Sequence, residues 1–233
     1  IGRYYASESY ISHTDSRKGL INKLYHKART FMLMKKATWV SSFANKPDGH
    51  LLDVGTGTGY FSAYMRSKGW QVDAVEPDPE ARNIGKQLHD LDIQKPEAIF
   101  QWSDKRYDVI TLWHVLEHIH QLREQLDQYY RLLKPGGALI IAVPNYTSLD
   151  SRHYGSGWAA YDVPRHLWHF SPKSMEALVS RHHFKLEKLS TMPLDAFYVS
   201  LLSEKYRGRK VFGVISGLMW GSVTWLASLF DKR

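Results

Sequence analysis

Apolar residues recur at helical spacing through residues 17–44, with lysines and arginines between them, which predicts one or two amphipathic helices. After Pro47, Asp48 and Gly49 break this pattern, short apolar runs alternate with further helical patterns. We expect strands over 50–54, 71–75, 98–101, 107–112, 138–143 and 184–191. Helices are expected over 59–68, 79–90, 115–133 and 172–182.

This alternation of strand and helix is typical of the α/β class. It predicts right-handed crossovers and a doubly wound, mainly parallel sheet covered by helices on both faces. Ligands of such sheets bind at the carboxyl ends of the strands. The long connection over 144–171, rich in aromatic residues and histidine, is expected to lie beyond that edge and to carry function.

The length of 233 residues favours one catalytic core with additions at its ends. We expect an N-terminal lid and amphipathic helix over 1–48, the core over 49–192, and an apolar helical extension over 193–233. The absence of cysteine excludes a disulfide scaffold, a thiol nucleophile and a cysteine zinc site. No secretory signal pattern opens the sequence, so the cytoplasm is the expected location.

The net charge of +8 favours anionic partners without choosing among nucleic acid, phosphorylated metabolites and an acidic membrane surface. The basic residues are scattered, so the sequence shows no dedicated nucleic-acid stripe.

A glycine-rich turn follows the first expected strand, where Asp53 precedes Gly55, Gly57 and Gly59. A dinucleotide fingerprint would need a glycine at position 60 or 62, where tyrosine and serine stand, so a nicotinamide cofactor is disfavoured. An acid beside the turn suits a cationic ligand that bears an ammonium and a sulfonium, as S-adenosylmethionine does. The second strand ends at Glu76, whose carboxylate can accept hydrogen bonds from ribose hydroxyls.

With these features in order, residues 50–191 resemble the class I methyltransferases. The segment Asp53–Gly59 resembles their first motif, Glu76 their ribose acid, and Tyr107–His118 their fourth strand with the segment that passes under the donor. The phrases TLWHVLEH, LLKPGGALIIAVPN and PRHLWHFSP look like a bacterial branch of small-molecule and envelope-associated methyltransferases.

The resemblance implies S-adenosylmethionine as cofactor and a donor site made of Asp53, Gly55, Thr56, Gly57, Gly59, Glu76, Pro77, Trp102, Trp113 and His114. Family members often carry an acid near the end of the third strand to meet the adenine. Here that region is short, and Gln101, Trp102 and Ser103 take its place as expected adenine neighbours.

Methyl transfer is an in-line displacement, so the protein has to position a nucleophile and exclude water, and a hydroxyl acceptor also needs a base. His166 and His114 are the candidates for that base, against a role as hydrogen-bond donors that fix the local backbone. The candidate acceptor contacts are Tyr10, His13, Arg165, His166 and His169. A salt bridge to Asp162 is the alternative for Arg165, and a structural role is the alternative for His169.

Two other enzyme classes compete with a small-molecule methyltransferase. The segment His114–His118 matches HxxEH, the inverted zinc-protease pattern, but His114 follows a strand and the sequence supplies no third ligand, so we expect no metal. RNA methylation is the second alternative, because it fits the positive net charge. Enzymes that methylate the amino groups of bases commonly carry a proline-aromatic motif after the fourth strand, and this sequence lacks it. We therefore do not expect DNA to be a substrate.

Residues 211–230 form an uncharged stretch of bilayer-spanning length, with Gly213, Gly217 and Gly221 at four-residue spacing. Its glycines and hydroxyl residues favour packing on the domain or on a second copy in a homodimer, with a membrane surface as the alternative.

We therefore expect methyl transfer to a small-molecule, lipid-linked or sugar-linked acceptor, with a hydroxyl favoured. A non-catalytic nucleoside-binding protein and a membrane-tethered adaptor remain as alternatives.

Overall fold

The computed structural model describes residues 20–192, 194–209 and 211–230. Within this range the chain forms two compact units. The first, called the sheet unit, contains residues 20–116 and 121–142. The second, called the helical unit, contains residues 117–120 and the described residues from 143 onward.

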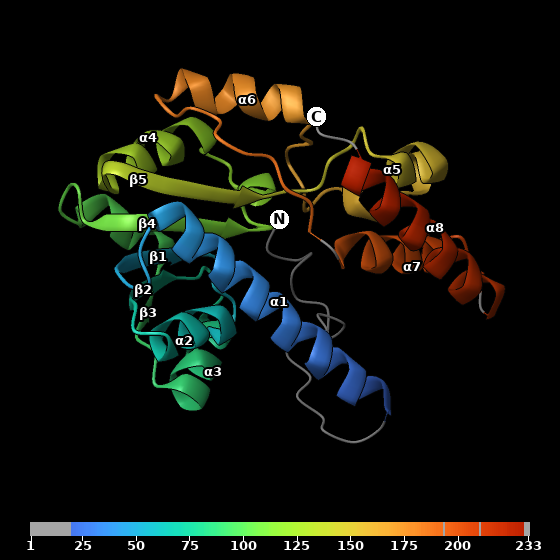
Figure 1. Cartoon of the computed structure of the whole chain (residues 1–233), viewed down its shortest axis with the longest axis horizontal. Coiled ribbons are helices and arrows are strands. Elements are labelled where there is room, and N and C mark those ends of the chain that lie inside the picture. Colours follow the sequence, from blue (N-terminus) through green and yellow to red (C-terminus); the bar gives the residue numbers. More distant parts are fainter. Residues whose placement is uncertain (1–19, 193, 210, 231–233) are drawn as a thin grey trace. The chain divides into compact units, whose positions relative to one another are not determined.

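The sheet unit is built on five strands in the order β3-β2-β1-β4-β5, and every neighbouring pair is parallel (Figure 1). The strands are β1 (His50–Val54), β2 (Gln71–Val75), β3 (Ile93–Gln94), β4 (Tyr107–Trp113) and β5 (Leu133–Ala142). The order reverses between β1 and β4, which is where doubly wound sheets place their ligands. The predicted fold class is confirmed.

Helices α1 (Leu20–Ala44) and α2 (Tyr60–Ser67) cover one face of this sheet. Val40 and Met65, both fully buried, pack there with Leu51 and Val109 of the two central strands. Helix α3 (Pro79–His89) connects β2 to β3, and α4 (Leu122–Leu132) connects β4 to β5. The connections from β1 to β2 to β3 proceed across the sheet in one direction, and the connection from β4 to β5 proceeds in the other. Because all of these crossovers are right-handed, α4 lies on the opposite face of the sheet from α2 and α3.

Local sequence explains where these helices begin. Gly59 takes a left-handed conformation immediately before α2. Asp78 caps α3 by accepting a hydrogen bond from Glu80 N, and Pro79 occupies the first helical position, where a missing N–H costs nothing.

Three predicted elements are absent from the structure or divided in it. Residues 96–101 form a 3₁₀ helix, η3 (Pro96–Gln101), and the third strand is the short β3 before it, because Pro96 sets a helical start for the apolar run that follows. The predicted helix over 115–133 is a 3₁₀ turn, η4 (Leu116–His118), followed by α4. Residues 184–191 form no strand, since they pair with no neighbouring strand in the described part of the chain.

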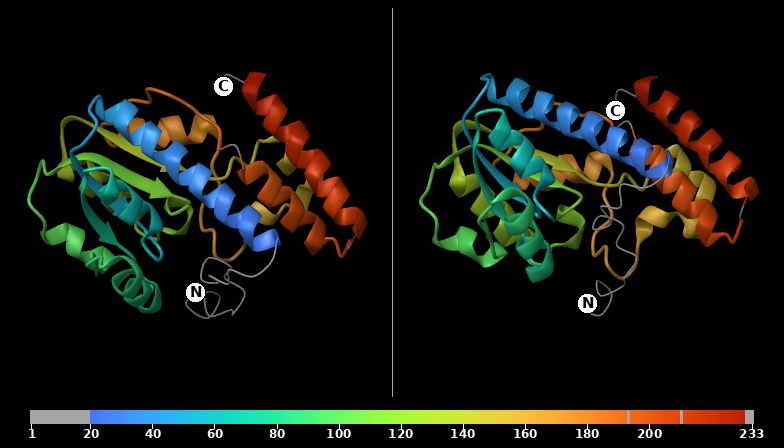
Figure 2. Two further views of the ribbon diagram at one scale, coloured as in Figure 1. Left: turned by 60° about the horizontal axis from the view of Figure 1, so that its bottom comes forward. Right: turned by 90° about the horizontal axis from the view of Figure 1, so that it is seen from below.

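The helical unit contains α5 (Leu149–Tyr154), η5 (Gly155–Gly157), η6 (Ala159–Tyr161), α6 (Pro172–Arg181), α7 (Asp195–Tyr206) and α8 (Val211–Phe230). Helices α7 and α8 run side by side (Figure 2). A Cβ atom on Gly217 would lie 3.0 Å from Leu201 Cα, and one on Gly221 would lie 2.8 Å from Phe197 Cα. The four-residue glycine spacing therefore lets the two backbones approach closely.

None of the described helices is both long enough and apolar enough to cross a membrane.

Candidate active site

The glycine turn after β1 has a backbone that side chains would distort. Gly55 and Gly57 have φ values of +67° and +58°, a region that L side chains rarely adopt. A Cβ on Gly55 would also lie 2.4 Å from Val115 Cγ2, whereas a Cβ on Gly57 would meet nothing within 4 Å. Gly55 is therefore required by packing, and Gly57 leaves the backbone open for the close approach of a ligand.

Glu76 is fixed beside this turn by backbone donors. Its Oε2 accepts a hydrogen bond of 2.8 Å from Gly57 N, and its Oε1 accepts one of 3.0 Å from Asp78 N. Burial raises the pKa of Glu76, although these two hydrogen bonds favour the ionised form. The carboxylate at the end of β2 is thus held in place at the glycine turn.

Asp53 at the end of β1 is 1% exposed and is held by two hydroxyls. Ser62 Oγ donates to Oδ2 at 2.9 Å, and Thr111 Oγ1 donates to Oδ1 at 2.8 Å. Burial raises the pKa of Asp53, while the hydroxyls of Thr56, Thr111 and Ser62 and the charge of Lys36 oppose the shift. The carboxylate is thus part of a buried polar network under the turn, which Thr56 joins through a 2.8 Å hydrogen bond to Ser62.

Sequence reasoning missed Ser62 and Thr111. A usable signal was present, because Thr111 interrupts the apolar run of β4 and buried polar groups nearly always have a partner.

Trp113 and His114 lie where β4 ends. The Trp113 ring contacts Phe61 edge-on at 5.5 Å, and the ammonium of Lys36 lies 4.6 Å from its centroid. Its Nε1 is buried and has no hydrogen-bond partner among the described residues. His114 has a φ of +59°, a strained conformation for a non-glycine residue of the kind that gathers at functional sites, and its N–H donates to Ala142 O at 2.9 Å.

The left-handed conformation of His114 also bears on the HxxEH pattern. That pattern needs both histidines on one helical face, and His114 lies on no helix, so the zinc-protease interpretation is wrong.

The structure does not bring Trp102 to the glycine turn. Its ring lies 6.0 Å from that of Tyr107 at the start of β4, with the Arg106 guanidinium 5.5 Å from its centroid. Since β3 ends at Gln94, the residues that follow the third strand begin at Lys95, several positions earlier than the sequence pattern suggested. Pro77 follows β2, and its carbonyl accepts a hydrogen bond of 2.8 Å from Arg82. Tyr10, His13 and the predicted lid lie outside the described residues.

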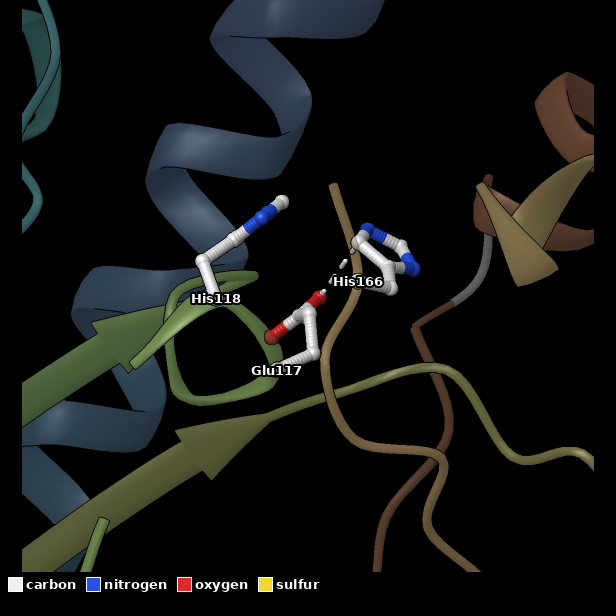
Figure 3. A group of neighbouring side chains, drawn as sticks. All are labelled: Glu117, His118 and His166. Carbon is white, nitrogen blue, oxygen red and sulfur yellow. Dashed lines mark ion pairs between the residues drawn. The ribbon is translucent and has the colours of Figure 1, made fainter. Parts of the chain in front are cut away.

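A second cluster of functional groups lies in the helical unit, where Glu117, His118 and His166 face one another (Figure 3). Glu117 is 1% exposed, and its Oε1 lies 4.0 Å from His166 Nε2. Nδ1 of His166 lies 2.8 Å from Ala160 O, and Nδ1 of His118 lies 3.1 Å from Arg165 O. Burial lowers the pKa of His166, although the Glu117 charge opposes the shift.

The two other predicted acceptor contacts from this segment have local partners. Arg165 Nε donates to Asp162 Oδ1 at 3.0 Å, which is the salt bridge that the sequence offered as the alternative to a substrate contact. Nε2 of His169 lies 3.0 Å from Tyr161 O, a contact within the same loop.

Similarity to known proteins identifies the family. Residues 26–189 match the model of a family described as "Methyltransferase domain". The chain belongs to this methyltransferase family. It is a methyltransferase that depends on S-adenosylmethionine, as the sequence pattern predicted.

Individual relatives agree with this assignment. A ubiquinone biosynthesis O-methyltransferase from Xanthomonas oryzae pv. oryzae is 28% identical over 168 residues, covering 66% of this chain and 70% of the relative. A malonyl-[acyl-carrier protein] O-methyltransferase from Erwinia billingiae is 28% identical over 147 residues, covering 61% of this chain and 57% of the relative. The structure of a SAM-dependent methyltransferase from Archaeoglobus fulgidus aligns with a TM-score of 0.56 at 18% identity, covering 82% of this chain and 93% of that one, and shows the shared fold.

The residues at the glycine turn of the methyltransferase fit S-adenosylmethionine. Gly57 offers open space at a backbone position where a Cβ would meet nothing, and the carboxylate of Glu76 is anchored to that same residue. The buried Asp53 adds negative charge beneath the turn, which suits a sulfonium cation.

Proposed function

We propose that this methyltransferase moves a methyl group from S-adenosylmethionine to a hydroxyl oxygen of a small acceptor. The observation that carries the proposal is the state of His166, whose Nδ1 faces the Ala160 carbonyl and whose burial favours the neutral ring. A neutral imidazole with its Nε2 lone pair available is the form that a base for a hydroxyl needs. The two O-methyltransferase relatives support an oxygen acceptor.

The donor site of this proposal is the turn from Gly55 to Gly59 together with Glu76 and Pro77. Glu76 meets the ribose hydroxyls, Gly57 allows the donor to approach the backbone, and Asp53 supplies negative charge beneath it. Trp113 and His114 line the donor from the end of β4.

Bound S-adenosylmethionine supplies an electrophilic methyl carbon attached to a positively charged sulfur. The acceptor oxygen forms a bond to that carbon as the carbon–sulfur bond breaks, and the sulfur leaves as a neutral thioether. The hydroxyl proton passes to Nε2 of His166. His114 remains the alternative base, and Arg165 and His169 are acceptor contacts in the same proposal.

An acceptor screen with methyl-labelled S-adenosylmethionine tests the reaction. Phenols, catechols, acyl carboxylates and polyprenol-linked sugars are compared with aromatic amines, and products are identified by mass spectrometry. Methylation of hydroxyls that falls by about 10²–10⁴-fold in His166→Ala supports the proposal. Methylation confined to amines, or hydroxyl methylation unchanged in His166→Ala, contradicts it.

We also propose that the outward face of α8 meets an anionic membrane surface, where a lipid-linked acceptor would be found. This face is mainly apolar, with Ser222 as a polar residue within it, and its exposed apolar residues are Phe212, Val214, Ile215, Leu218, Met219, Val223 and Leu226. Apart from Val214 and Leu218, which flank the glycines, their spacing places them on the side of α8 opposite the glycines that contact α7. The exposed cations Lys205, Arg207 and Arg209 precede the helix and complement an anionic surface.

Co-sedimentation with vesicles tests this surface. The methyltransferase is expected to bind phosphatidylglycerol-containing vesicles, and Ile215→Ser with Met219→Ser is expected to release it. Leu88→Ser is the matched control, because Leu88 is 52% exposed on α3 in the sheet unit. If the double variant instead turns a dimer into a monomer and vesicles never bind, a second copy covers the face and the membrane proposal is wrong.

A further inference from the structure

We propose that Glu117, His118 and His166 form a binding site for a divalent transition-metal cation such as Zn²⁺ or Co²⁺. The three side chains each bring one ligand atom into a group that spans no more than 4.8 Å (Figure 3). All three belong to the helical unit, so the site is complete within one compact part of the chain.

The orientation of the two imidazoles favours metal binding. A backbone carbonyl can only accept a hydrogen bond, so Nδ1 carries the proton in both rings, on His118 toward Arg165 O and on His166 toward Ala160 O. Whenever such a ring is neutral, its Nε2 therefore holds the lone pair that a metal requires. Metal-binding histidines in proteins are commonly oriented in this way, by donating the other ring N–H to a carbonyl or carboxylate.

The spacing of the ligand atoms is also compatible with a shared cation. His166 Nε2 and Glu117 Oε1 lie 4.0 Å apart, which is too long for a direct hydrogen bond. Two ligands on a tetrahedral zinc ion, each with a bond of about 2 Å, are separated by about 3.3 Å. The observed distance exceeds this by about 0.7 Å, so the two atoms are close enough to approach one cation and are not hydrogen-bonded to each other.

Hydrogen bonds around the cluster fix the backbone that carries the ligands. Leu167 N and Trp168 N donate to Glu117 O at 2.8 and 3.3 Å, and Trp168 Nε1 donates to Ile119 O at 2.7 Å. These bonds hold the two ligand-bearing segments together independently of any ion. A site that is preformed in this way loses little conformational entropy when it binds a metal.

The donor set selects the class of cation. Two imidazole nitrogens with one carboxylate suit zinc and neighbouring transition metals, whereas magnesium and calcium prefer oxygen ligands. Three protein ligands leave at least one position open, as in catalytic zinc sites. The role of the cation rests on the proposed function, because a hydroxyl bound at the open position would have its pKa lowered and would lose its proton to solvent. His166 would then act as a ligand in the loaded protein and as the base only in the metal-free one.

Metal titration of the tag-free, chelator-treated protein tests the site without any acceptor. Calorimetry with Zn²⁺ and visible absorption with Co²⁺ are expected to show one tight equivalent. Glu117→Gln, His118→Ala and His166→Ala are each expected to weaken binding by more than about 100-fold, since outer partners alone commonly contribute 10–100-fold. His120→Ala is the matched control, because His120 is exposed in the same turn and lies outside the cluster.

X-ray absorption on the cobalt-loaded wild type keeps the test independent of variants that fail to fold. A shell of two imidazoles and a carboxylate supports the site. Absence of stoichiometric binding, or binding that persists in His118→Ala with His166→Ala, overturns it. Hydroxyl methylation by protein that binds no metal would leave the proposed function intact, whereas tight metal binding without hydroxyl methylation would contradict only the proposed function.

Discussion

Thr111 and Asp53 are direct register partners on the neighbouring parallel strands β4 and β1, and the hydroxyl of Thr111 donates to the Asp53 carboxylate at 2.8 Å. Both side chains point to the face of the sheet that α2 covers, where Ser62 donates to the other carboxylate oxygen. The switch point of the sheet therefore carries a buried negative charge whose position is set by two strands and a helix. Such a charge is costly to bury unless its lone pairs are satisfied.

Thr111→Val is expected to lower the free energy of unfolding by about 1–3 kcal/mol, because it leaves one oxygen of a buried carboxylate without its donor. It is also expected to raise the pKa of Asp53 further, since burial already raises it and one opposing hydrogen bond is lost. Urea unfolding at pH 7 measures the first effect. Thr111→Ser keeps the hydroxyl and serves as control, and equal losses in the two variants would show that the methyl group matters and the hydrogen bond does not.

Gly55→Ala is expected mainly to lower the stability of the fold, whereas Gly57→Ala is expected also to weaken donor binding. Both place a Cβ at positive φ, which costs roughly 1–2 kcal/mol of backbone strain. Only Gly55→Ala also clashes inside the protein, with Val115, so Val115→Ala should recover part of its stability. Gly57→Ala fills open space instead and is expected to weaken S-adenosylmethionine binding beyond its effect on stability.

Calorimetric titration with S-adenosylmethionine, together with thermal unfolding of each variant, separates the two. Unchanged donor affinity in a folded Gly57→Ala protein would remove Gly57 from the donor site. Rescue of Gly57→Ala by Val115→Ala would show that the two glycines act in the same way.

The central strands were predictable from sequence because their signal is local. The apolar runs of β1 and β2 lie between a Pro–Asp–Gly break and clear helical patterns, and their bounds in the structure agree with the prediction. The uncharged run from Val211 to Phe230 coincides with α8 in the structure. The third strand was misplaced because a short apolar run after Pro96 fits a strand and a 3₁₀ turn equally well.

The proximity of Glu117 and His166 could not be predicted, because it depends on contacts between segments far apart in the sequence. Sequence spacing places Glu117 with His114 as an HxxEH pattern, yet the left-handed backbone at His114 separates that pair from any common helix face. The partner that the structure supplies comes from the loop after η6, whose path is fixed by hydrogen bonds such as that from Leu167 N to Glu117 O. Periodicity and motif spacing carry no information on such contacts.

The pH dependence of hydroxyl methylation is expected to report His166 when the enzyme is kept metal-free with a chelator. Burial lowers the pKa of His166, so its neutral form persists below the ordinary histidine value of about 6.5. The value of kcat/KM should be flat near neutral pH and fall on the acid side with a midpoint under about 6.5. Glu117→Gln should move that midpoint lower still, because the Glu117 charge favours the protonated ring.

Rates from pH 4.5 to 8 with the best hydroxyl acceptor measure this midpoint, and His166→Ala should remove the acid limb. A midpoint above about 6.5 in the wild type, or an upward movement in Glu117→Gln, would contradict the assignment.

Asp108 lies near the start of β4, at the other end of the sheet from the glycine turn. It is expected to make the free energy of unfolding depend on pH. Burial of Asp108 opposes ionisation, but hydrogen bonds from Lys46, His50 N and Lys134 hold its pKa at about 2. A folded pKa below the unfolded value of about 3.9 adds stability that is fully present above that value and is lost as pH falls through about 2. The contribution should be about 1–2 kcal/mol, since both lysines are partly exposed to solvent.

Unfolding of wild type and Asp108→Asn between pH 2 and 7 measures this difference. The variant should be less stable by a constant amount above about pH 5, and the two curves should approach each other as pH falls toward 2, because Asp108 then takes up a proton and loses its charge. Asp104→Asn is the control, since Asp104 pairs with Arg131 but is 60% exposed and should change stability little at any pH. A gap between wild type and Asp108→Asn that stays constant down to pH 2 would mean that shape, and not the charge of Asp108, stabilises this end of the sheet.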